Sequence, residues 1–216
     1  MKRIEFAAIA AVALMFSACA SNPSSMSGDG MMNDGMMSKG MKMDRASTMS
    51  MMSSWPMEAK KAAMAAMDKY GAPDEATETM LVWHNNGPWK RSMVYKKEVP
   101  HDFPMPHIDV WEQVIDYRVP TDKFDDLAAY DGSVVVDRTQ GEMSARCDKE
   151  AANFLALNLA DDIVNGRRST EEARQFYADT IKAKMEGRSS PYLEGLRFSP
   201  MRATNDRDMA AMPKMR

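Results

Sequence analysis

Cysteine and histidine are scarce in this chain. Its 216 residues include two cysteines, Cys19 and Cys147, and three histidines, His84, His101 and His107. The motifs GxSxG, HExxH and CxxC are absent from the sequence, and so is a glycine-rich phosphate loop. Because these signatures of common enzyme classes are missing, the sequence favours a binding or structural protein over an enzyme.

An excess of positive charge is also missing. Lysine and arginine number 28 against 31 acidic residues, which gives a formal net charge of −3. Such a balance offers no electrostatic surface for a phosphate backbone, so we expect no nucleic-acid partner. Hydrophobic residues make up 44% of the chain, which is too many for a wholly disordered protein and indicates one ordinary domain with extensions.

A long hydrophobic run is the third absence. The apolar stretch at residues 6–16, FAAIAAVALMF, follows Lys2 and Arg3 and is much shorter than the roughly 20 residues that a transmembrane helix needs. A positive start followed by a short apolar run is typical of a secretory signal peptide. We therefore predict that residues 1–18 are a signal peptide.

The residues after this run resemble the lipobox of bacterial lipoproteins. FSAC, residues 16–19, places two small residues before Cys19, although Phe16 stands where that family usually has leucine. The resemblance implies cleavage before Cys19 and attachment of lipid, commonly including palmitate, to that cysteine. Ala20 and Ser21 follow in place of the aspartate that often retains lipoproteins at the inner membrane. For a Gram-negative source this implies an outer-membrane protein that faces the periplasm.

An ordinary secretory cleavage is the alternative. Ala18 and Ala20 in the sequence ACA also satisfy the small-x-small rule for signal peptidase. Lipidation is favoured, because several buried acyl chains give stable anchoring. The membrane would then be a partner through the N-terminal lipid.

Methionine is the residue in excess, with 24 copies in the chain. Many of them lie between residues 26 and 57 among Ser, Gly, Asp and Asn, in short repeats such as GMMND, GMMSK and GMKMD. Low hydrophobicity and frequent glycine are typical of a disordered linker. We predict a flexible tether at residues 19–54.

Three interpretations of the methionines remain open: a plain tether, a sink for oxidants, and a binding segment for Cu(I). The tract resembles methionine-rich segments of periplasmic copper-handling proteins, although it contains no histidine. Copper is accordingly a possible cofactor, and no cofactor is certain. The candidate ligands in the tract are Met31, Met32, Met36, Met37, Met41 and Met43.

The folded part is predicted at residues 55–187. Helical patterns occur at residues 57–70 and 121–130, and strand patterns at 78–84, 89–97, 108–119 and 133–138. A proline-rich loop is expected at 99–107, and an irregular C-terminal extension at 188–216 that contacts the domain through Tyr192, Leu196 and Phe198. The pattern predicts an α+β fold with a small antiparallel sheet of about four strands, packed by helices.

Two further helices are expected after the last strand. Thr139 and Glu142 have the spacing of a capping box, which predicts a long helix up to about residue 164 with Cys147 on its apolar stripe. Asp161 and Asp162 would be solvated on that helix. Another helix should begin at Ser169.

Possible chemistry gathers on the proline-rich loop. His101, Met105 and His107 would suit copper, and histidine with the neighbouring Asp102 or Asp109 could suit zinc. Cys147 is interpreted as a buried, inert thiol in preference to a nucleophile. The aromatic residues of the sheet are a core or, alternatively, a ligand surface: Trp83, Trp89, Tyr95, Trp111 and Tyr117.

The sequence thus predicts a lipid-anchored cell-envelope protein with a binding or structural module. Its partner could be another envelope protein or the cell wall. The alternative is a copper buffer or relay that uses the methionine tract, with His101, Met105 and His107 as further ligands. An enzyme centred on Cys147 or the histidines is the less favoured third hypothesis.

Overall fold

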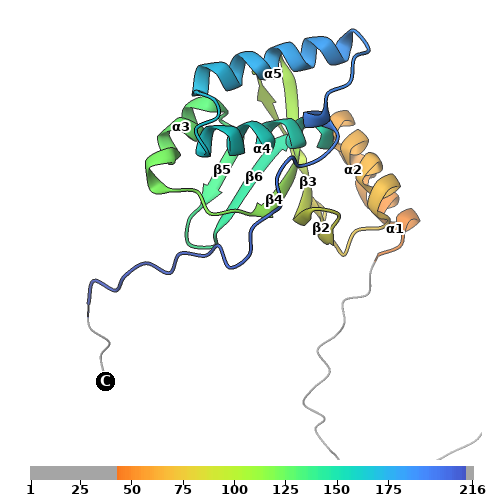
Figure 1. Cartoon of the computed structure of the whole chain (residues 1–216). Helices are drawn as coiled ribbons and strands as arrows, with labels where there is room; N and C mark the ends of the chain where they lie inside the picture. Colours follow the sequence, from red (N-terminus) through yellow and green to blue (C-terminus); the bar gives the residue numbers. More distant parts are fainter. Residues whose placement is uncertain (1–42, 213–216) are drawn as a thin grey trace, which may run out of the picture. The chain divides into compact units, whose positions relative to one another are not determined.

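The computed structural model describes residues 43–212, which contain six strands and five α-helices (Figure 1). All neighbouring strands are antiparallel, in the order β1-β2-β3-β4-β6-β5, so the predicted α+β class is confirmed with six strands in place of about four. The strands are β1 (Glu75–Ala76), β2 (Met80–Asn86), β3 (Trp89–His101), β4 (His107–Asp116), β5 (Val134–Asp137) and β6 (Glu142–Cys147).

The helices belong to the same folded unit. They are α1 (Arg45–Met51), α2 (Met57–Tyr70), α3 (Phe124–Tyr130), α4 (Glu150–Val164) and α5 (Thr170–Met185), with short 3₁₀ turns η1 (Met52–Ser54), η2 (Thr121–Lys123) and η3 (Pro191–Leu193). The predicted helices at 57–70 and 121–130 and the helix after Ser169 are confirmed. Ser169 and Glu172 form a complete capping box at the start of α5. Within residues 43–212, no helix combines the length and the apolar character that crossing a membrane requires.

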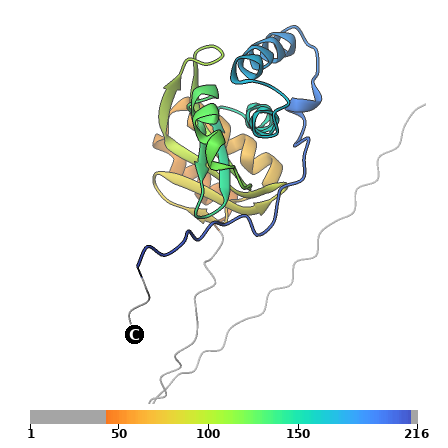
Figure 2. The same cartoon turned by 60° about the vertical axis from the view of Figure 1, so that its left-hand side comes forward.

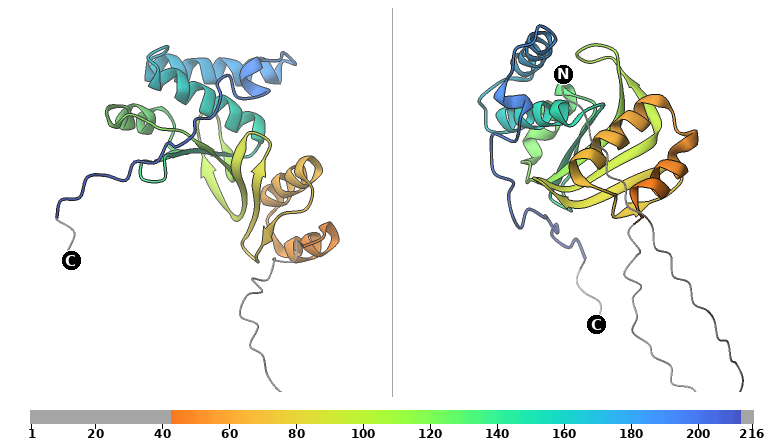
Figure 3. Two further views of the ribbon diagram at one scale, coloured as in Figure 1. Left: turned by 60° about the horizontal axis from the view of Figure 1, so that its bottom comes forward. Right: turned by 90° about the vertical axis from the view of Figure 1, so that its right-hand side faces the viewer.

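One face of the sheet carries the hydrophobic core. The register places Leu81, Val94 and Trp111 opposite one another on this face, and Ala145 of β6 lies on it too. Helix α2 packs on the β2–β4 part of the sheet and α4 on the β4–β6 part, while α5 packs on α4. Figures 2 and 3 show α2 beside one half of the sheet and α4 and α5 beside the other. Two clusters of buried side chains result, one under each helix group.

The other face of the sheet is covered by charged side chains and not by helices. Arg91 donates to Glu142 at 2.9 Å, and the Tyr95 hydroxyl donates to Glu112 at 2.8 Å. The guanidinium of Arg146 lies 5.6 Å from the centre of the Tyr95 ring. The aliphatic stems of such side chains shield Val114, which is buried on this face.

The long helix predicted from residue 139 is wrong up to residue 149. Residues 142–147 form β6, and the helix begins only at Glu150. Gly141, with φ of 67°, closes a turn between β5 and β6, which the capping-box spacing did not reveal. Glu142 pairs with Arg91 across the sheet in place of capping a helix.

The folded part begins earlier than residue 55. Residues 45–54, which the sequence placed in the tether, form α1 and η1, with Thr48 and Met52 buried. Asp44 caps α1, because its Oδ1 accepts from the backbone N–H groups of Ala46 and Ser47 at 2.9 and 3.0 Å. The signal peptide, Cys19 and the tract methionines Met31, Met32, Met36, Met37 and Met41 lie outside the described residues.

Strand β3 is longer than predicted. It continues to His101, so the expected loop at 99–107 shortens to residues 102–106. Ser92 and Val94 are fully buried, because their register partners Gln113 and Trp111 face the core. The C-terminal segment behaves as predicted: Tyr192, Leu196 and Phe198 pack against the larger buried cluster.

Candidate functional site

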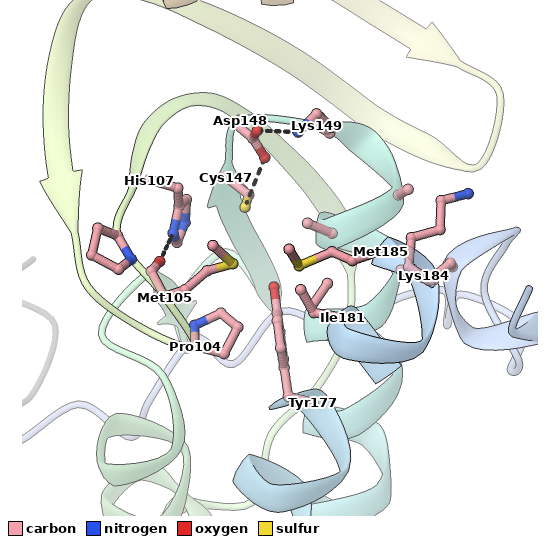
Figure 4. A pocket seen from close by; sticks show the side chains of 14 residues that line it. Pro104, Met105, His107, Cys147, Asp148, Lys149, Tyr177, Ile181, Lys184 and Met185 are labelled. Carbon is pink, nitrogen blue, oxygen red and sulfur yellow. Dashed lines mark hydrogen bonds and ion pairs between the residues drawn. The ribbon is translucent and has the colours of Figure 1, made fainter. Parts of the chain in front are cut away.

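A cavity of about 370 Å³ lies where the β3–β4 loop, the end of β6 and helices α4 and α5 meet (Figure 4). Most of its wall is apolar. Met105 and Pro104 line it from the loop, while Ile181 and Met185 line it from α5. Figure 4 shows the side chains of Met105 and Met185 extending into the cavity from opposite sides. A largely apolar cavity with few polar groups is the usual form of a small-ligand site.

His107 forms one polar part of the wall. As the first residue of β4 it is half-buried, and its Nδ1 donates to the Met105 carbonyl oxygen at 2.9 Å. Its Nε2 lies 3.0 Å from Asp109 Oδ1. Burial is the largest single influence and opposes the charged ring, but Asp109, Cys147 and the Met105 carbonyl together outweigh it, so the pKa of His107 is raised to about 11.

His101, Asp109 and Asp131 surround this ring. His101 is paired directly with His107 across β3 and β4, and the ring centres are 4.9 Å apart. Asp109 is only 2% exposed and accepts a hydrogen bond from the Ser133 hydroxyl. Asp131 is also buried, which raises the pKa of its carboxyl group. Two imidazoles and two carboxylates therefore share one buried corner of the domain.

Cys147 lines the same cavity from the end of β6. It is 6% exposed, and burial raises the pKa of its thiol, although His107 acts in the opposite direction. Its Sγ lies 3.5 Å from Asp148 Oδ1. The group is therefore a thiol at neutral pH, as the sequence interpretation of an inert cysteine requires, but it lies on a strand and not on the predicted helix.

The structure brings together two of the predicted metal ligands. His101 and His107 are adjacent, and Met105 reaches the cavity with 45% of the residue exposed. Met43 precedes α1 and does not line the cavity. Sequence reasoning noted Asp109 beside the histidines but missed Asp131. Asp131 comes from the turn after α3, and a turn residue distant in sequence offered no signal.

Four of the five aromatic residues belong to the core, whereas Tyr95 is half-buried on the charged face of the sheet. Trp83, Trp89 and Trp111 are at most 3% exposed and lie in the two buried clusters. Tyr117 is also buried, and its hydroxyl donates to Asp161 at 2.6 Å.

The expectation that Asp161 and Asp162 are solvated is wrong. Both are buried and form ion pairs with Arg167 and Arg168, which lie three and four residues after the end of α4. A helix end enclosed by α5 and η3 needs such partners, because a buried carboxylate without one is costly.

In comparisons with known proteins, no family model, no curated protein and no solved structure matches this chain. The function of the chain is therefore inferred from the geometry of the cavity and of the residues around it.

Proposed function

We propose that this chain is a lipid-anchored cell-envelope protein whose α+β domain binds a small, largely apolar ligand. The short apolar leader and Cys19 support export and anchoring at the outer membrane, facing the periplasm. The observation that carries the binding role is the cavity of about 370 Å³ between the β3–β4 loop and α5. The cavity selects a ligand by its size and by its apolar surface.

The chemistry of the wall supports an apolar ligand. Pro104, Met105, Ile181 and Met185 present methyl, methylene and thioether groups, and the volume lies within the range of about 300–1,000 Å³ for small-molecule sites. Methionine side chains are flexible and polarizable, so they adapt to ligands of different outline. Burial of such a ligand would be driven by removal of apolar surface from water.

The test uses the neutral fluorescent probe N-phenyl-1-naphthylamine and the chain from residue 20 to 216, which retains every described residue. The wild-type chain is expected to bind the probe saturably. Ile181→Trp places an indole ring in the cavity and should raise the Kd at least about tenfold, since the indole competes for space with the rings of the probe. The probe is excited directly and not through tryptophan, so the new tryptophan does not contribute to the measured fluorescence.

Met64→Trp is the matched control, because Met64 is exposed on α2 and does not line the cavity. It should bind the probe as the wild type does. Circular dichroism confirms that both variants are folded. Equal binding by wild type and Ile181→Trp would refute the cavity as the binding site.

A second candidate function is a copper buffer or relay. It is favoured by the juxtaposition of His101 and His107 beside a cavity that Met105 and Met185 also line. Imidazole and thioether are both ligands for copper, and thioether favours Cu(I). Competition with a Cu(I) chelator should show fewer ions bound after Met→Leu substitution of Met31, Met32, Met36, Met37 and Met41. Unchanged uptake would rule out the tract as a copper ligand.

A further inference from the structure

Three side chains converge on one point beneath the cavity. His101 ends β3 and His107 begins β4, and the two are register partners. Asp109 lies two residues further along β4, so its side chain is on the same face of the strand as His107. One donor atom from each of the three lies within 4.8 Å of the others.

The two contacts to Asp109 have the spacing of ligands around a single ion. His107 Nε2 is 3.0 Å from Asp109 Oδ1, and His101 Nδ1 is 3.3 Å from Asp109 Oδ2. Ligands bound tetrahedrally at the usual zinc distances lie roughly 3.3–3.5 Å apart. The three donor atoms, which lie within 4.8 Å of one another, would therefore have to move closer together to enclose a metal ion.

Two of these donor atoms make no aligned hydrogen bond within the described part of the chain. Asp109 Oδ1 and His107 Nε2 are close but not aligned as acceptor and donor, and neither has a hydrogen-bond partner within residues 43–212. Asp109 is 2% exposed, so water does not replace that partner at the surface. A buried carboxylate oxygen that faces an imidazole nitrogen in this way is a ready position for a cation.

The remaining nitrogen of each ring faces an oxygen acceptor. His107 Nδ1 donates to the Met105 carbonyl, and His101 Nε2 lies 3.7 Å from Asp131 Oδ1. Metal-binding histidines are commonly oriented in this way, with the second nitrogen held by a carbonyl or a carboxylate. The Ser133 hydroxyl holds Asp109 in the same manner.

We propose that His101, His107 and Asp109 bind one divalent first-row transition ion, with zinc as the first choice. Two imidazole nitrogens and a carboxylate oxygen suit zinc, whereas Cu(I) prefers sulfur. Three protein ligands leave a fourth coordination position on the ion for water or another small ligand. The site shares His107 with the wall of the cavity, but its three ligands do not include the cavity thioethers, and it does not depend on the proposed apolar ligand.

The experiment measures zinc binding to the chain from residue 20 to 216 after treatment with a chelator. Calorimetry should show one ion per chain, and cobalt(II) in its place should give the visible absorption of a four-coordinate site. Asp109→Asn and His101→Ala should each lower the affinity at least about 100-fold, and Asp131→Asn about 10–100-fold, because it only positions His101. His84→Ala is the matched control, since His84 is exposed on β2 and outside the cluster.

Circular dichroism and thermal unfolding without metal identify any variant that fails to fold. His107→Gln then provides a second test, because it keeps a polar side chain of similar size. The proposal is overturned if the folded wild type binds no zinc, or if Asp109→Asn, His101→Ala and His107→Gln bind it as tightly as the wild type. Ile181→Trp should retain zinc, so failure of the ligand cavity and failure of the metal site are distinguishable.

Discussion

At the scale of single residues, Glu150 connects the two halves of the domain. Its carboxylate accepts hydrogen bonds from Lys69 and Tyr70 of α2, from Trp89 Nε1 at 2.7 Å and from Gln113 Nε2 at 3.0 Å. Tyr70 packs against both buried clusters and Trp89 belongs to one of them, so one side chain at the start of α4 holds α2, β3 and β4 together. Burial alone would raise the pKa of Glu150, but these donors lower it below its usual value.

Glu150→Gln is predicted to destabilise the domain by about 1.5–3 kcal/mol at neutral pH, because charge-assisted hydrogen bonds are lost from a buried site. The folded-state pKa of Glu150 is below its unfolded value, so its contribution is complete above the unfolded pKa and is lost as the pH falls through the folded pKa. Urea unfolding at neutral and acidic pH measures the difference between wild type and variant. A difference that does not shrink at acidic pH would contradict this account.

At the scale of secondary structure, the sequence predicts elements well where one local pattern dominates. Ser169 with Glu172 and the alanine-rich stretch of α2 identify their helices correctly. Residues 142–147 were misread because capping-box spacing also fits a tight turn followed by a strand, and pairing with β4 and β5 decides between them. Helix α1 was missed because its stability comes from the Asp44 cap and from burial of Met52, neither of which composition reveals.

The candidate site was predictable only in part, for a related reason. His101 and His107 are close in sequence, and a hairpin brings them together. Asp131 and Tyr177 come from elements more than 20 residues away, so their approach depends on tertiary packing. Sequence spacing therefore identified the histidines and Asp109 but not the cavity or the acid that orients His101.

The contact between the β5–β6 turn and the C-terminal segment gives a prediction at this scale. Gly141 and Gly166 have nearly equal φ values of 67° and 68°. A Cβ on Gly141 would lie 2.2 Å from the Thr204 carbonyl carbon, whereas a Cβ on Gly166 would have no heavy atom within 4 Å. Gly166→Ala should cost about 1–2 kcal/mol from backbone strain, and Gly141→Ala should cost a further 1–3 kcal/mol or so from the clash.

Chemical denaturation of the two variants measures this difference directly. In the wild type the Thr204 hydroxyl donates to the Gly141 carbonyl oxygen at 2.6 Å, which anchors this C-terminal segment to the turn. The clash in Gly141→Ala should displace the segment, so limited proteolysis should cleave it around Thr204 faster than in Gly166→Ala. Equal stability and equal cleavage in both variants would show that the segment does not dock on the turn.

At the scale of the whole molecule, the two cysteines have separate roles. Cys147 is buried beside the cavity, and Cys19 precedes the methionine tract that leads to the folded domain. If Cys19 carries lipid, the domain is held at a membrane, and 25 residues lie between that cysteine and the start of α1. The cavity and the His101–His107–Asp109 cluster would then sample the space next to that membrane.

Cys19→Ser should move the protein from the membrane fraction to the soluble fraction and abolish labelling by palmitate, because no thiol remains for the lipid. Cys147→Ser is the matched control and should stay in the membrane fraction. Mass spectrometry of the wild-type N-terminus distinguishes the alternatives: a lipid-modified Cys19 supports the anchor, whereas a mature chain that begins at Ser21 indicates ordinary secretory cleavage. In the second case the domain would be free of the membrane, and its ligand or metal would have to be sought in solution.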